Sequence, residues 1–230
     1  MSFLSRIKDS PVLIRAVPFV VFVALTSLQS FLGGAAPFWI YLAKTVLGGW
    51  MLWAIRPYIQ EMRWMVSGLA LLVGVAVFLL WIGLRPCLEA LGLNPSFAEL
   101  KISGKPWNPH AQFGEASAWA WFFVVARFLG SSLVVPPLEE VFFRSFVYRY
   151  IIRNDFEKVS LSQFRWVAFL ATSGMFALEH REWLAGLLCG FAFQGLVCWK
   201  GRLGDAIMAH AVTNFLLGLW VIRQGAWNFW

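Results

Sequence analysis

Charged residues are scarce in this chain. They make up 13% of its 230 residues and hydrophobic residues make up 60%, against about 25% and about 45–50% in soluble domains. This composition excludes an ordinary soluble domain and indicates a polytopic membrane protein. The formal net charge of +7 does not indicate nucleic-acid binding, because the basic residues mostly flank apolar segments, where membrane orientation and anionic lipid explain them better.

Cysteine is equally scarce, with only Cys87, Cys189 and Cys198. Three cysteines give no disulfide framework, and Cys189 and Cys198 lie in one apolar segment without Cys-x-x-Cys spacing. We therefore expect small buried side chains there and no redox or metal site. The 14 tryptophans and 22 phenylalanines, by contrast, suit helices that face lipid and anchor at its interfaces.

Long apolar segments dominate the chain. A spanning helix needs about 20 mostly apolar residues, and shorter helices are tolerated where they line a cavity. We predict an all-α, polytopic membrane protein of about eight helices that enclose a cavity, in one helical domain over 1–230. The candidate helices are 16–32, 36–55, 64–84, 117–135, 138–152, 166–180, 183–199 and 203–222. The first run also resembles a secretory signal, but the many later spans favour an uncleaved first span.

The longest polar interruption, 85–116, separates the N-terminal helices over 1–84 from the rest. We expect it to be a loop outside the hydrocarbon core with a short helix near 96–100, and we expect His110 within it to be a solvated side chain. Two cations, Lys44 and Arg127, lie inside apolar segments, and we expect them to snorkel to an interface.

The basic residues give conflicting orientations. Those near the first two spans, which are Arg6, Lys8, Arg15, Arg56 and Arg63, place the N-terminus and the 56–63 loop in the cytoplasm. Eight full spans would then place the later basic residues outside, namely Arg153, Lys158, Arg165, Lys200 and Arg202. One solution is that 138–152 does not fully cross the membrane.

The run from Pro136 to Arg144 concentrates charge in an apolar context, which marks a functional site by default. Pro136-Pro137 suit the start of a helix, and two glutamates in a first turn would be favoured by the helix dipole without any further role. Arg144 follows Glu140 by four residues, so the two can pair on one face. Glu139 points about 100° away and stays free. Different environments separate the pKa values of two carboxylates and so assign them different roles.

Two later stretches carry histidine. His180 closes an apolar segment one turn after Phe176, where it could simply complement the helix dipole. His210 and Asn214 lie four residues apart inside the last apolar segment, on one helix face. A buried polar pair needs partners, and an interhelical hydrogen bond is the alternative to a catalytic role.

These residue types favour the hydrolysis of a peptide bond. A glutamate and a histidine can share a water and remove its proton, while a second histidine and an asparagine can donate to an oxyanion. The sequence places no serine or cysteine beside a histidine, so direct water attack is favoured over an acyl-enzyme. We expect no cofactor. The alternative is zinc held by Glu139, His180 and His210, although the chain has no His-Glu-x-x-His motif.

Three motifs in this order, Glu139-Glu140-x-x-x-Arg144, Phe176-x-x-x-His180 and His210-x-x-x-Asn214, resemble the CPBP family of CAAX proteases and bacteriocin-processing enzymes, also called Abi. The family includes the type II CAAX prenyl endopeptidase. The resemblance implies an eight-helix intramembrane glutamic endopeptidase with its catalytic core at about 117–222. It also implies Glu139 as general base, His180 as a water ligand, His210 and Asn214 as the oxyanion hole, and Glu140 and Arg144 as orienting residues.

Three functions remain open at this point. The first is a protease in a bacterial inner membrane that cleaves a membrane-associated, lipidated or exported protein, with a possible link to exosortase-type sorting. The second is a non-catalytic scaffold or bacteriocin-immunity factor of the same family. The third is a transporter with a buried proton relay, although the chain shows no inverted repeat.

Overall fold

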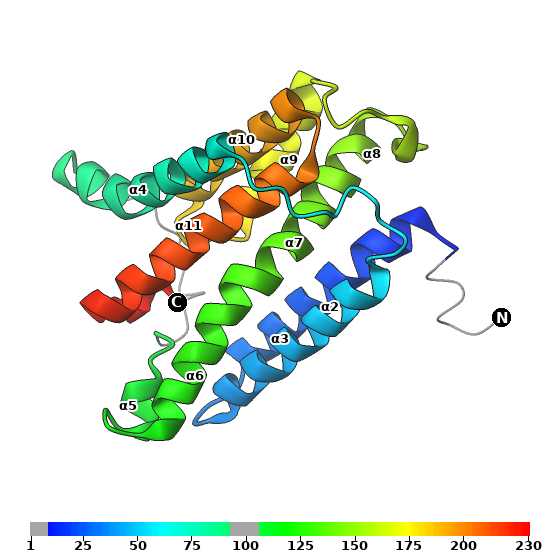
Figure 1. Cartoon of the computed structure of the whole chain (residues 1–230). Coiled ribbons are helices and arrows are strands. Elements are labelled where there is room, and N and C mark those ends of the chain that lie inside the picture. Colours follow the sequence, from blue (N-terminus) through cyan, green and yellow to red (C-terminus); the bar gives the residue numbers. More distant parts are fainter. Residues whose placement is uncertain (1–8, 93–105) are drawn as a thin grey trace. The chain divides into compact units, whose positions relative to one another are not determined.

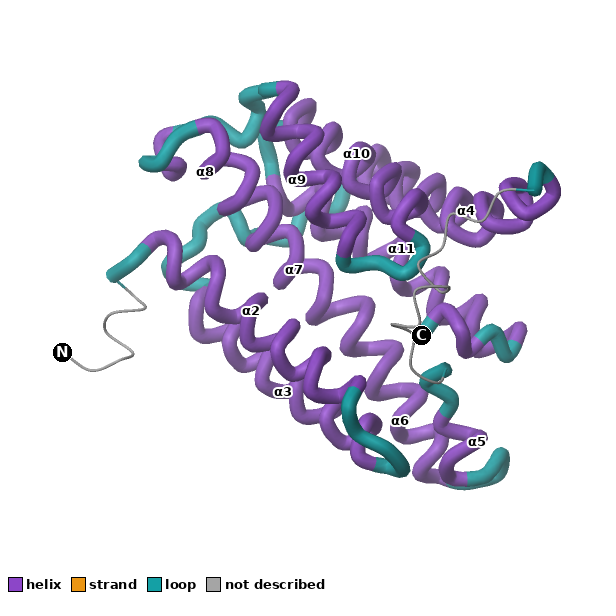
Figure 2. Tube along the Cα trace, turned by 180° about the vertical axis from the view of Figure 1, so that it is seen from behind, coloured by secondary structure: helices purple, strands orange, loops and turns teal. Residues whose placement is uncertain are grey.

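The computed structural model describes residues 9–92 and 106–230, and helices account for 78% of these residues. None of them forms a strand, so the all-α prediction is confirmed (Figures 1 and 2). The helices are α2 (Pro11–Ser30), α3 (Ala36–Ile55), α4 (Gly68–Ala90), α5 (Pro109–Phe113), α6 (Ala118–Leu129), α7 (Val135–Glu140), α8 (Tyr148–Ile152), α9 (Trp166–Leu178), α10 (Trp183–Lys200) and α11 (Leu203–Gln224). Arg6, Lys8 and the expected helix near 96–100 lie outside the described residues.

Six helical segments in the described part are long and apolar enough to cross a membrane. They are Pro11–Ser30, Ala36–Ile55, Gly68–Ala90, Ala118–Ile152, Trp183–Lys200 and Leu203–Gln224, with the shorter apolar helix Trp166–Leu178 beside them. The chain is therefore a multi-pass membrane protein. The expected count of eight is approximate, because the segments predicted at 117–135 and 138–152 form one continuous helical run.

Pro136 and Pro137 lie inside this run, so the prediction that they begin a helix is wrong. Proline lacks the N–H that the helix ladder needs and crowds the carbonyl four residues before it. Turns of π-helix at Gly130–Val134 and Val141–Val147 flank α7, which contains both prolines. Such wider turns change which carbonyl each N–H reaches and occur frequently at functional sites. Glu139 and Glu140 therefore lie in the interior of a 35-residue helical run.

The continuous run also removes the conflict in orientation. Suppose that Ala118–Ile152 crosses the membrane once and that α9 and α10 then cross in opposite directions. The basic residues after Ile152 and after Lys200 would then lie on the same side of the membrane as the 56–67 loop. Two contacts of residues 61–67 with later segments of the chain agree with this topology. Met65 N donates to Gly204 O at 3.4 Å, and Arg149 pairs with Glu61 at 2.7 Å.

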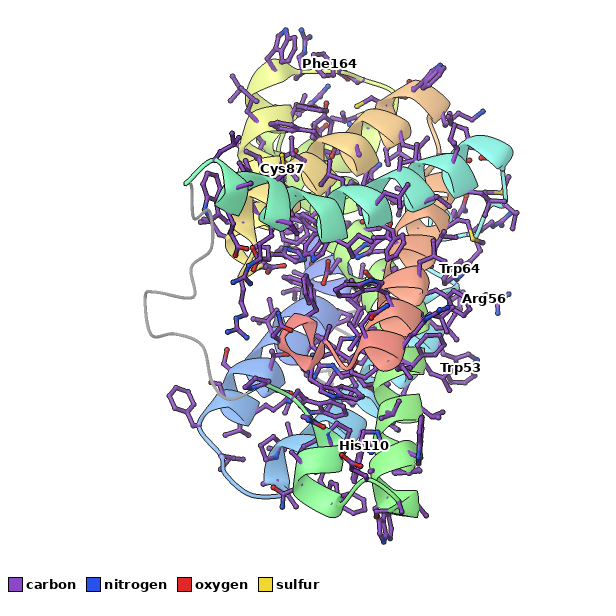
Figure 3. The ribbon with its side chains drawn as sticks, turned by 90° about the vertical axis from the view of Figure 1, so that its left-hand side faces the viewer. Trp53, Arg56, Trp64, Cys87, His110 and Phe164 are labelled. Atoms are coloured by element: carbon purple, nitrogen blue, oxygen red, sulfur yellow. The ribbon has the colours of Figure 1, made fainter. Side chains whose placement is uncertain are left out.

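The described ends of the stretch 85–116, which was predicted as a polar loop, are partly helical. Helix α4 continues through Pro86 to Ala90, and α5 begins at Pro109. His110, labelled in Figure 3, lies in α5 with its ring 5.1 Å from that of Trp121 and 5.4 Å from that of Trp227. The expectation of a solvated loop histidine is therefore wrong, because aromatic side chains pack around this ring.

The chain divides into two compact units. Unit 1 comprises Met1–Gln60, Lys105–Leu138 and Asn214–Trp230, and unit 2 comprises Glu61–Gly104 and Glu139–Thr213, in so far as each is described. In unit 1, α2 and α3 lie side by side (Figures 1 and 2). Its core is aromatic, built on Phe38, Tyr41, Trp107 and Phe123.

Unit 2 is held together by close helix contacts at glycine. In α10, a Cβ added at Gly190 would lie 2.9 Å from Ser173 Cβ and 3.0 Å from Ser173 Cα in α9. One turn earlier, a Cβ at Gly186 would lie 3.2 Å from His180 Cβ. Small residues spaced by four let membrane helices approach closely. This approach brings α9, and with it His180, against α10.

Replacing Gly190 by alanine should destabilise unit 2. The new methyl group would press on the backbone of Ser173, and overpacking of this kind costs about 1–3 kcal/mol, which exceeds the gain of at most ~1 kcal/mol from the better helix propensity of alanine. Thermal unfolding in detergent measures the effect. Gly195→Ala in the same helix is the control, because nothing lies within 4 Å of its added Cβ and it should unfold at or above the native temperature.

Candidate active site

A buried ion pair lies at the centre of unit 2. Arg144 Nη1 is 3.3 Å from Glu140 Oε1, and both side chains are 0% exposed. The pairing expected from their spacing of four residues is therefore present, although the backbone from Val141 onward is π-helical. Separating such a pair would leave a bare charge in an apolar interior, so each residue requires the other.

The arginine is held against aromatic rings. Its Cζ lies 4.2 Å from the centroid of the Phe176 ring and 5.9 Å from that of Phe193. Apart from the ion-pair contact of one terminal nitrogen, Nη1, with Glu140, the buried nitrogens Nε, Nη1 and Nη2 have no hydrogen-bond partner among the described residues. A ring face stabilises the cation but takes up none of its in-plane N–H donors. Arg144 thus combines a neutralised charge with unused donors.

His210, from α11, lies between the two glutamates. Its Nδ1 is 3.0 Å from Glu140 Oε1, and its Nε2 is 3.9 Å from Glu139 Oε2. The ring stacks on Phe193 with centroids 5.0 Å apart. Because a carboxylate only accepts, Nδ1 carries the proton toward Glu140. This bond orients Nε2 toward Glu139.

The two glutamates have unequal environments. Glu140 is fully buried and contacts both Arg144 and His210. The side chain of Glu139 is 15% exposed, and its buried Oε2 has no hydrogen-bond partner among the described residues. Oε2 of Glu140 is likewise buried without a partner there, so the two differ in that Glu140 is engaged through Oε1, whereas Glu139 is partly exposed and can be reached by a ligand. A proton acceptor has to be accessible in this way.

His180 follows the end of α9 and is also oriented by its neighbours. Its Nδ1 is 2.8 Å from Phe176 O, and since a carbonyl only accepts, Nδ1 carries the proton and Nε2 is left as an acceptor. The ring contacts Phe176 at 4.7 Å and Trp81 at 5.3 Å. Burial lowers the pKa of His180 to about 4. His180 is accordingly neutral at physiological pH.

Phe176 links these groups. Its ring contacts Arg144, His180 and, at 6.0 Å, His210. Sequence reasoning placed Phe176 one turn from His180 but missed that it contacts the other two motifs. It also missed Trp81, because α4 precedes the motifs by many residues and no spacing rule connects them.

Asn214 is placed differently. It lies one turn after His210 on α11 but belongs to unit 1, where its side-chain Nδ2 donates to Ser131 O at 2.9 Å. Direct contacts bring together Glu139, Glu140, Arg144 and His210, and Phe176 adds His180 to them. The role of Asn214 stays a prediction.

The zinc alternative can be tested against the side-chain arrangement. Among the residues that the structure describes, no three His, Cys, Asp or Glu side chains are grouped as metal ligands. Glu139, His180 and His210 are therefore not arranged as the three protein ligands of a catalytic zinc site.

Comparison with known families identifies the central part of the chain. Residues 118–216 match the family model described as Type II CAAX prenyl endopeptidase Rce1-like. This segment is therefore similar to the Rce1-like members of the CPBP family. The resemblance seen in the three motifs is thereby confirmed, and it supports an intramembrane protease of the CAAX type in general. The matched segment includes all six candidate site residues. No curated protein and no solved structure matches the chain.

Replacing Arg144 by methionine should strongly destabilise the protein. The change leaves the carboxylate of Glu140 buried without its cation, which costs about 3–5 kcal/mol. Chemical or thermal unfolding in detergent measures the loss. The double variant Glu140→Leu with Arg144→Met should recover much of it, because no unpaired charge remains.

The control for this prediction is Arg153→Met. Arg153 pairs with Asp155 at the surface, where both side chains are largely exposed, and such pairs contribute about 0–1 kcal/mol. Equal effects of Arg144→Met and Arg153→Met would contradict the importance assigned to the buried pair.

The lowered pKa of His180 predicts a pH dependence of stability. Protonation is harder in the fold than in the unfolded chain, where the histidine pKa is about 6.5, so the unfolded state binds the proton first. Stability should therefore fall as the pH drops below about 6.5 and level off below about 4. Unfolding temperatures at pH 7 and pH 5 should differ more in the native protein than in His180→Gln. An identical pH dependence in the two proteins would contradict the buried neutral state.

Proposed function

We propose that the chain is an intramembrane endopeptidase that hydrolyses a peptide bond with water activated by Glu139 and His180. The observation that carries this proposal is the unequal pair of glutamates around His210. Oε1 of Glu140 is bound to both Arg144 and His210, whereas Glu139 is 15% exposed and its Oε2 has no hydrogen-bond partner among the described residues. Such a pair leaves the carboxylate of Glu139 to act as the base, beside the carboxylate of Glu140 that is already bound.

Water activation is the first step. The Glu139 carboxylate removes one proton from a water molecule, and Nε2 of His180 accepts a hydrogen bond from the other O–H, which orients the water. His180 suits this task because its Nδ1–H is engaged by Phe176 O. General base catalysis of this type contributes about 10²–10⁴-fold.

Attack and collapse follow. The hydroxide oxygen adds to the peptide carbonyl carbon, and the carbonyl electron pair moves onto oxygen. For this step His210 has to carry both ring protons, so that Nδ1–H donates to Glu140 and Nε2–H donates to this oxyanion. The amide of Asn214 is proposed as a second donor. The protonated Glu139 then gives its proton to the leaving nitrogen as the C–N bond breaks. Glu140 and Arg144 orient His210 throughout.

The substrate is proposed only as a class. A protease with its site on membrane helices acts on protein substrates in the bilayer. A lipidated or exported protein fits this class, and the expected link to exosortase-type sorting and the bacterial inner membrane stay predictions.

Glu139→Gln should abolish proteolysis and leave the protein folded, because the amide keeps the shape of the side chain but cannot take the proton. The measurement compares protein termini in membranes that contain the native chain or the variant at matched abundance. We expect new termini with the native chain and a loss of at least about 100-fold in their yield with the variant.

Glu115→Gln is the matched control, because Glu115 is an exposed carboxylate in unit 1. It should give the same termini as the native chain. If the termini are identical for all three proteins, the catalytic proposal is wrong and a non-catalytic scaffold becomes the better explanation.

A further inference from the structure

Arg127 in unit 1 lies in a cage of aromatic rings. Its Cζ is 4.6 Å from the centroid of the Trp107 ring, 4.7 Å from that of Tyr41 and 5.7 Å from that of Trp230. The residue as a whole is partly exposed. Rings stabilise the cation through their faces, but the planar guanidinium also presents five N–H donors in a fixed fork. None of these donors has a hydrogen-bond acceptor among the described residues.

A second unused donor lies beside this cage. Trp107 is only 6% exposed, and its buried Nε1 has no hydrogen-bond partner among the described residues. A buried donor left without an acceptor costs about 1–3 kcal/mol. Two neighbouring side chains that offer donors and no acceptor indicate a ligand rich in acceptor oxygens.

Lys44 adds a second basic group. It is 4% exposed, donates to Thr26 Oγ1 at 2.7 Å, and its Nζ lies 4.9 Å from the centroid of the same Tyr41 ring that Arg127 contacts. The acids of unit 1 within the described residues are Asp9 and Glu115, and both are exposed. No ion pair between either acid and Lys44 or Arg127 is present in the described part of the chain. Neither acidic side chain of the described part of unit 1 therefore neutralises Lys44 or Arg127.

The position of the cage along the helices identifies the source of an anion. Thr26 lies four residues before the end of α2 at Ser30, about 6 Å, and Tyr41 lies five residues after the start of α3 at Ala36, about 8 Å. The polar layer on each side of a bilayer is about 5–8 Å thick, so the groups that Lys44 and Arg127 contact lie close to the boundary between headgroups and acyl chains.

We propose that Arg127, Trp107 and Lys44 bind the phosphate group of an anionic phospholipid. The planar fork of Arg127 matches two phosphate oxygens, Trp107 Nε1 offers a third donor, and Lys44 supplies a second basic group. An anionic headgroup is favoured over a zwitterionic one, because choline or ethanolamine would bring a further cation to a site that already holds the guanidinium of Arg127.

The test measures lipid binding to the full chain in detergent by native mass spectrometry and thermal unfolding, with phosphatidylglycerol, phosphatidylcholine or inorganic phosphate added. Phosphatidylglycerol should bind and raise the unfolding temperature of the native protein. Arg127→Gln should weaken this binding about ten-fold or more, as expected for a charge-assisted hydrogen bond. Trp107→Phe keeps the ring and removes the donor, and it should weaken binding a few-fold.

Arg223→Gln is the control, because Arg223 is an exposed cation of unit 1 in the last turn of α11, and it should bind lipid like the native chain. If Arg127→Gln does not fold, Trp107→Phe and Lys44→Met decide the outcome. Equal binding of phosphatidylcholine, or an equal shift with inorganic phosphate alone, would overturn the assignment to an anionic lipid. Unchanged binding in Trp107→Phe and Lys44→Met would overturn the site itself.

Discussion

The burial of Glu140 with Arg144 is the constraint on which unit 2 depends. Buried charges are costly unless each has a partner. Here the carboxylate of Glu140 contacts both Arg144 and His210. The arrangement fixes the side chain of Glu140 and, through it, the orientation of His210. It leaves Glu139, one residue earlier on the same helical run, as the partly exposed carboxylate that does not pair with Arg144. A structural ion pair thus creates the asymmetry that the proposed chemistry uses.

Close helix packing keeps this asymmetry in place. The glycines of α10 allow α9 to approach, and the Phe176 ring of α9 then lies against Arg144 while its carbonyl accepts from His180. A rigid aromatic contact and a backbone hydrogen bond orient two groups at once. Catalytic groups have to be held in this way, since small displacements cost large factors in rate.

The two units distribute charge in opposite ways. Unit 2 neutralises its buried arginine with a glutamate, whereas unit 1 surrounds Arg127 with aromatic rings and leaves its N–H donors without acceptors among the described residues. Aromatic rings stabilise a cation without adding a negative charge. The first arrangement suits a reaction with developing charge, and the second suits an anionic lipid.

Composition and local spacing determined the class of this protein. The apolar segments alone indicated a helical membrane protein, because the bilayer requires backbone hydrogen bonds to be satisfied within helices, and the four-residue spacing of Glu140 and Arg144 predicted their pairing. Only the tertiary structure decided that Pro136 and Pro137 lie within a continuous run, since π-helical turns depend on packing that no local pattern shows. It also decided that Phe176 joins three motifs and that Trp81 contacts His180, because contacts between distant segments follow from helix packing and leave no periodic signal in the chain.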